Sequence, residues 1–250
     1  VYFALTLAIE GMVLISLVSL DILLCYVFFE AMLIPMYFLI GGFGGSRSGA
    51  GSLTKLGDGT VVLGGSASYA GGTTVDAGVL TAGNATALGT AGTVTVKSGG
   101  TLNIADGITL AAGTPISLYG TLRGTGTAGY AGPVTLEAAS ARIDTPLAGD
   151  TLTLSAAMDG RGSLTKSGAG TLKLSGANSY TGSTAINGGT VFLNSGSRLP
   201  DFTVVSLPGA TSTLDLNGTS QHIGSLDGSG TIKLGAGTLG VTQNVDGTFS

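Results

Sequence analysis

Two hydrophobic patterns divide the chain of 250 residues. Residues 1–20 and 21–40 are nearly continuous apolar runs, each long enough as a helix to cross a hydrocarbon layer about 30 Å thick. After residue 45 the apolar residues no longer follow a helical period, and short runs alternate Thr or another polar residue with Val, Leu or Ile. An alternation of period two predicts strands. The six clearest runs are 93–96, 101–104, 151–154, 171–174, 213–216 and 231–234.

The apolar N-terminal segment predicts a transmembrane helical hairpin over residues 1–40, followed by a Gly-rich junction over 41–50. Asp21 can cap the second helix, and Gly41 and Gly42 can end it. A cleaved secretory signal peptide is the alternative, but it needs a basic n-region, a short apolar core and a small-residue cleavage site. The sequence has none of the three.

Two carboxylates, Glu10 and Glu30, fall inside these apolar runs. A carboxylate at membrane depth is costly and often serves proton or ion movement. The alternative for both is a protonated side chain or one that faces a partner subunit.

Residues 26–41, YVFFEAMLIPMYFLIG, resemble a membrane helix of the M (chain 4) subunit of respiratory complex I, the proton-pumping NADH:quinone oxidoreductase. The resemblance covers about the first 44 residues and implies that Glu30 occupies a proton-relay position. The family's later helices and its partner lysine have no counterpart, and residues 1–46 contain no Lys. Because a proton path needs a chain of donors and acceptors, we predict that this chain does not pump protons.

The β-region repeats itself, since residues 51–78 match residues 162–189 at 15 of 28 positions. Each unit is a short strand followed by a Gly-containing turn, which favours stacked coils. We predict a right-handed parallel β-helix with about 20–25 residues per coil and about eight to ten coils over residues 51–250. A β-sandwich is the alternative, but it would need longer strands and more core aromatics.

The repeated motif, clearest at residues 162–184, is similar to the passenger-associated repeat of bacterial autotransporters. The resemblance implies a secreted β-helical passenger at the bacterial cell surface or outer membrane. It also implies a following outer-membrane barrel, whose long alternating strands are not found before Ser250. The expected function is a non-enzymatic adhesive or spacer segment; the ligand of such a segment, its oligomeric state and the side of the membrane on which it lies stay open.

Composition removes several classes of function. Of the 45 Gly, all but four follow residue 44. Residues 45–250 have ten cations against eleven carboxylates, a charge too balanced to attract nucleic acid. Cys25 is the only cysteine, which excludes an intrachain disulfide and a Cys-based zinc site. The glycines of GTGTAG (124–129) are followed by no helix, as a dinucleotide site would require. We therefore predict no cofactor and no metal.

Candidate catalytic groups are few. His222 is the sole histidine, so it cannot form a metal site with other histidines, and a solvent-facing turn residue is the simpler interpretation. A polysaccharide-acting enzyme would need convergent carboxylates, and Asp144, Asp150 and Asp159 are the only loose grouping. The repeated Tyr69 and Tyr180 are interpreted as structural.

The two resemblances belong to different membranes, because complex I lies in the inner membrane and autotransporters pass through the outer one. The sequence therefore predicts a fusion near residues 41–51. A genomic rearrangement, a chimera of sequence assembly and an acquired membrane anchor all remain open. The alternative function is that of a membrane-subunit fragment of complex I, in the inner membrane.

Overall fold

The computed structural model describes residues 51–243 together with 248 and 249. The transmembrane pair predicted for residues 1–40, the junction at 41–50 and Glu30 lie outside these residues. In the described part of the chain all regular structure is strand, and no helix there could span a bilayer.

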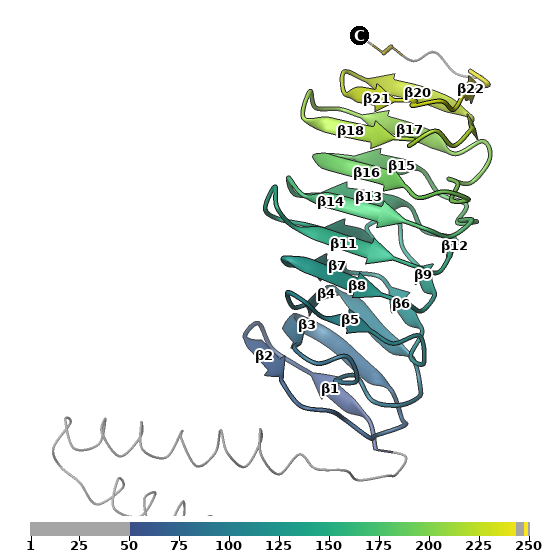
Figure 1. The fold of residues 1–250 in the computed structure, drawn as a ribbon. Coiled ribbons are helices and arrows are strands. Elements are labelled where there is room, and N and C mark those ends of the chain that lie inside the picture. Colours follow the sequence, from purple (N-terminus) through teal and green to yellow (C-terminus); the bar gives the residue numbers. More distant parts are fainter. Residues whose placement is uncertain (1–50, 244–247, 250) are drawn as a thin grey trace, which may run out of the picture. The chain divides into compact units, whose positions relative to one another are not determined.

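The strands stack in three parallel ladders, so that the chain winds through about nine turns of a β-solenoid (Figure 1). The first ladder joins β1 (Leu53–Lys55), β3 (Thr73–Ala82), β4 (Val94–Ile104), β6 (Ile116–Leu118), β9 (Val134–Leu136) and β12 (Met158–Gly160). The second runs through β2 (Thr60–Leu63), the later parts of β3 and β4, β7 (Thr121–Gly124), β10 (Arg142–Asp144), β13 (Leu164–Ser167), β15 (Thr184–Ile186), β17 (Val204–Leu207) and β20 (Ser225–Gly228).

The third ladder is a separate sheet of β5 (Thr109–Leu110), β8 (Thr127–Tyr130), β11 (Thr151–Leu154), β14 (Thr171–Leu174), β16 (Gly189–Leu193), β18 (Ser212–Asp215) and β21 (Thr231–Lys233). A further pair, β19 (Gln221–Ile223) with β22 (Leu239–Val241), lies near the end of the described chain. Every one of these strand pairs is parallel. The predicted parallel solenoid is confirmed, and the β-sandwich alternative is wrong, because a sandwich of that kind is built from antiparallel strands.

The coil length varies along the stack. Ile116 pairs with Val134, a step along the chain just below the predicted lower bound. Thr127 pairs with Thr151, a step near the predicted upper bound. The turns absorb part of this variation, and the pairing of β3 with β4 also shifts register between Val75 and Ala77.

The core is a column of Leu, Val and Ile side chains that point inward from each ladder. In β11 and β14 the Leu residues are buried and the alternating Thr and Lys residues are partly exposed. The predicted runs 151–154 and 171–174 have the observed bounds of these two strands. The separate runs predicted at 93–96 and 101–104 instead join into the single strand β4, because β4 pairs along its length with the long strand β3. On its other side the two ends of β4 pair with two different strands, β6 and β7.

Candidate functional site

The outer face of the third ladder presents a column of threonines. Each lies directly beside the next in the parallel register, with the spacing of about 4.8 Å between neighbouring strands. The column consists of Thr127, Thr151, Thr171, Thr190, Thr213 and Thr231. The third ladder therefore exposes a line of hydroxyl groups, built by the same alternation that fills the core. The next outward-facing line of the same strands carries Thr153, Lys173, Phe192, Asp215 and Lys233.

The second ladder carries a column of polar side chains that form hydrogen bonds with one another across neighbouring strands. Asn103 donates to Thr81 at 3.4 Å, Arg123 Nε lies 2.9 Å from Asp144 Oδ2, and Ser167 donates to Asp144 Oδ1 at 2.9 Å. Asp144 thus has its two oxygens occupied by neighbours from the coils before and after it. Its arrangement is that of a structural ion pair.

The structure separates the three carboxylates that the sequence grouped. Asp150 is buried and accepts from the backbone N–H groups of Gly126 at 2.7 Å and Leu147 at 2.8 Å. Asp159 is exposed in β12, on the first ladder, whereas Asp144 lies on the second. Among the described residues no three His, Cys, Asp or Glu side chains gather as a metal-binding group. The three carboxylates do not form the convergent group that a polysaccharide-acting enzyme would need, because they lie at different ladders around one coil.

His222 lies in strand β19 and not in a turn, although it is exposed as expected. Its Nε2 is 2.9 Å from Thr242 Oγ1, and its ring meets that of Phe202 edge to face with 4.8 Å between centroids. The Thr242 hydroxyl lies within hydrogen-bond reach of the imidazole, but neither of these contacts is with a carboxylate that would orient His222 as a base. We therefore interpret the contacts of His222 as positioning a surface aromatic ring.

A buried lysine occupies the same position in both copies of the repeat. Lys166 is fully buried, and its Nζ donates to the carbonyls of Ser167, Gly168 and Gly188 at 2.7, 2.9 and 3.1 Å. Lys55 donates to the carbonyls of Leu56, Gly57 and Ala77, at the same three offsets along the chain. The lysine of the repeat is thus an internal fastener of two successive coils. The run Leu-Thr-Lys places it on the inner face by the period of two, but this signal was missed because Lys is normally exposed.

Burial lowers the pKa of the Lys166 amine from 10.5 to about 8, and the nearby charge of Asp144 opposes part of that shift. Between about pH 8 and 10 the unfolded chain keeps a proton on Lys166 that the folded chain has lost. Stability therefore rises with pH across this window, by about 2 kcal/mol from this group. Below about pH 8 both states are protonated and the contribution is constant. Urea unfolding at several pH values should show the rise.

The matched variant for this titration is Lys166→Met, which fills a similar volume and cannot be protonated. Its stability should lack the upward slope between pH 8 and 10. An equal slope in both proteins would assign the effect to other groups.

Tyr69 and Tyr180 also repeat their contacts. Tyr180 is buried and its hydroxyl lies 2.6 Å from Thr184 Oγ1, while the Tyr69 hydroxyl lies 2.7 Å from Thr73 Oγ1, again four residues ahead. In both phenols burial raises the pKa above its ordinary value of 10, and the threonine bond opposes this. Both tyrosines are neutral packing groups at neutral pH.

Tyr180→Phe is expected to lower the free energy of unfolding by about 1 kcal/mol, because it removes one buried hydrogen bond without changing shape. Thermal unfolding should detect the loss. Tyr119→Phe, at a partly exposed tyrosine, provides the control and should leave the melting temperature unchanged. An equal change in the two variants would mean that the bond to Thr184 contributes nothing.

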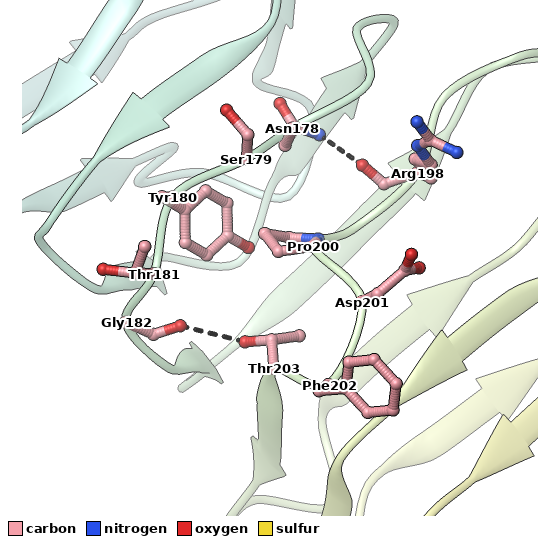
Figure 2. Close-up of a pocket in the computed structure, with 10 residues that line it drawn as sticks. All are labelled: Asn178, Ser179, Tyr180, Thr181, Gly182, Arg198, Pro200, Asp201, Phe202 and Thr203. Carbon is pink, nitrogen blue, oxygen red and sulfur yellow. Dashed lines mark hydrogen bonds between the residues drawn. The ribbon is translucent and has the colours of Figure 1, made fainter.

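A surface pocket of about 490 Å³ lies between two segments one coil apart, residues 178–182 and 198–203 (Figure 2). Its floor contains the buried side chains of Asn178, Tyr180 and Thr203. Its outer edge carries the exposed side chains of Arg198, Asp201 and Phe202. The sequence carries one local signal at these three residues, the Pro-Asp pair at 200–201, and that pair marks only a turn.

Comparison with known families identifies the repeated segments. Residues 53–82 and 164–191 match the passenger-associated-transport-repeat family. These two segments are similar to autotransporter passenger repeats. Each matched range contains its buried lysine, Lys55 or Lys166, and the tyrosine with its threonine partner. The residues matched by the family therefore include those that make contacts inside the solenoid between successive coils.

Two kinds of relative match different lengths of the chain. The adhesin BmaC autotransporter of Brucella suis is 39% identical over 156 residues, which is 60% of this chain and 4% of the adhesin. NADH-quinone oxidoreductase subunit M of Mycobacterium tuberculosis is 81% identical over 43 residues, which is 17% of this chain and 8% of that subunit. Both resemblances seen in the sequence are confirmed. The chain spans less than a tenth of each relative's length, and no solved structure matches it.

Proposed function

We propose that residues 51–250 serve as a surface-exposed segment of an autotransporter-like passenger, acting as a spacer or adhesive stalk. The observation that carries the proposal is that two separate passenger repeats, at residues 53–82 and 164–191, belong to one continuous parallel solenoid. Each coil is hydrogen-bonded to the coils before and after it, so that stiffness extends along the stack. A stiff rod is suited to holding a surface away from the cell.

We further propose that this segment is not an enzyme. On the second ladder the side chains of Arg123 and Asp144 are occupied by one another. The exterior of the third ladder carries a column of Thr hydroxyls, which bind water and neutral polar surfaces. Both features favour a structural or adhesive role.

Display on the cell surface is the testable core of this function. Antibodies raised against residues 51–250 should label intact cells of the source bacterium, and protease added to intact cells should remove the label. A periplasmic protein in the same cells should stay unlabelled and uncleaved. Labelling that requires permeabilised cells would overturn the proposal.

We propose that the N-terminal segment derives from a gene for a protein like subunit M and was joined to the β-region by a fusion. The 81% identity over 43 residues supports this origin. Glu30 would then keep its family position without the remaining groups of a proton path. Independent DNA reads across residues 35–55 test the fusion, since reads that fail to span the join would contradict it. Co-purification with other complex I subunits would instead favour the alternative of a working membrane subunit.

A further inference from the structure

The floor of the pocket between residues 178–182 and 198–203 is rigid. Asn178 accepts from Met158 N–H at 2.9 Å and donates to the Arg198 carbonyl at 2.8 Å, so it joins three coils. Thr203 Oγ1 donates to the Gly182 carbonyl at 3.0 Å. The polar atoms of the floor are therefore used within the protein, and the groups left for a ligand are those at the outer edge (Figure 2).

Phe202 stands at this edge in a backbone conformation that a bulky residue rarely adopts. Its φ is 64°, at the third position of a turn closed by Thr203 N–H to the Pro200 carbonyl at 3.2 Å. Glycine or asparagine usually occupies such a position. A strained backbone that persists in a well-packed fold points to a function for the side chain.

The strain has no compensation from burial, because Phe202 is 63% exposed. Its ring is nevertheless held in place by the edge-to-face contact with His222. The turn also packs closely on the next coil, where any side chain at Gly224 would collide with the Phe202 carbonyl. The result is an aromatic face that is fixed in orientation and open to solvent.

Arg198 and Asp201 lie on the same edge of the pocket as this ring and form no ion pair (Figure 2). The ion pairs among the described residues are those of Lys97 with Asp76 and Arg123 with Asp144. The edge therefore offers five guanidinium donors, a carboxylate acceptor and an apolar ring face, with no net charge. The Asp201 carboxylate would repel a phosphate or a carboxylate ligand. A purely apolar ligand would remove the charges of Arg198 and Asp201 from water without pairing them, which is costly.

We propose that this pocket binds a neutral saccharide, a deepening of the proposed adhesive role on which it rests. The apolar C–H face of a pyranose ring would stack on Phe202, and vicinal hydroxyls would donate to Asp201 and accept from Arg198. The volume of about 490 Å³ lies within the range of about 300–1,000 Å³ typical of small-ligand sites. The fixed ring reduces the entropy cost of binding.

The test is a titration of the full chain with four methyl pyranosides, in which binding is measured by calorimetry or by ligand-observed NMR. The four are the glucoside, the mannoside, the galactoside and the N-acetylglucosaminide. We expect at least one of the four to bind in the millimolar range or tighter. Phe202→Asn, which suits the positive φ but removes the ring, should weaken that binding at least 10-fold, as should Asp201→Asn. Phe202→Tyr should keep it within about 3-fold.

The matched control is Tyr119→Asn, which removes another partly exposed aromatic ring from a different coil. It should leave binding unchanged, and the melting temperature of Phe202→Asn should equal or exceed that of the parent chain. Absence of binding by all four glycosides, or equal loss in the Tyr119 and Phe202 variants, would overturn the inference. Surface labelling of intact cells with no glycoside binding would refute the saccharide site alone and leave the proposed passenger function standing.

Discussion

Lys166→Ala is expected to lower the free energy of unfolding by about 3 kcal/mol, since it removes a fully buried side chain and leaves a cavity. The substitution also deprives the carbonyls of Ser167, Gly168 and Gly188 of a charged donor. Hydrogen bonds of that kind are stronger than neutral ones. Urea unfolding followed by circular dichroism measures the change.

The control for this prediction is Lys97→Ala on the surface. Lys97 lies 3.8 Å from Asp76 with 55% of its side chain exposed, and such pairs contribute at most about 1 kcal/mol. Lys55→Ala tests whether the first repeat is fastened in the same way. If Lys166→Ala were no more damaging than Lys97→Ala, the buried lysine would not be a fastener of the coils.

The second large effect is expected for Gly189→Ala, which should lower the free energy of unfolding by at least about 3 kcal/mol because it adds both backbone strain and overpacking. Gly189 has φ 65°, and an added Cβ would crowd the carbonyl oxygens of Gly170 and Gly168 in the preceding coil. The variant must both adopt an unfavourable backbone region and push two strands apart. Gly78, the equivalent residue of the first repeat, has φ 67° and the same two kinds of contact. Thermal unfolding of Gly189→Ala measures the loss.

Gly149→Ala separates this packing effect from the general cost of replacing a glycine. Gly149 lies outside the left-handed region and has no atom within 4 Å of an added Cβ, so its replacement should be neutral or slightly stabilising. Comparable melting temperatures for the two variants would show that the coils can relax around Gly189 and that the repeat does not depend on it.

Together these residues explain why the same motif occurs twice in the solenoid. The carbonyl of Gly168 accepts from Lys166 and also lies against Gly189, and the carbonyl of Gly57 has the same relation to Lys55 and Gly78. Each repeat therefore locks two coils together by one buried donor and one close backbone approach. In a quasi-one-dimensional stack such local locks raise the stability of their neighbours, which a long surface stalk requires.

The sequence by itself determined the parallel solenoid, the positions of several strands and both resemblances. These follow from local signals: a period of two fixes which side chains face inward, and Gly-containing turns fix where each strand ends. The tertiary structure alone decided which residues meet between coils. It separated Asp144, Asp150 and Asp159, and placed Arg198, Asp201 and Phe202 around one pocket. The period of two puts Lys55 and Lys166 on the inner face, two residues after Leu53 and Leu164, but only the fold decides which carbonyls receive each amine. These outcomes depend on which ladder and coil each residue occupies and on the backbone of single turns, and a repeating pattern of polar and apolar positions encodes neither.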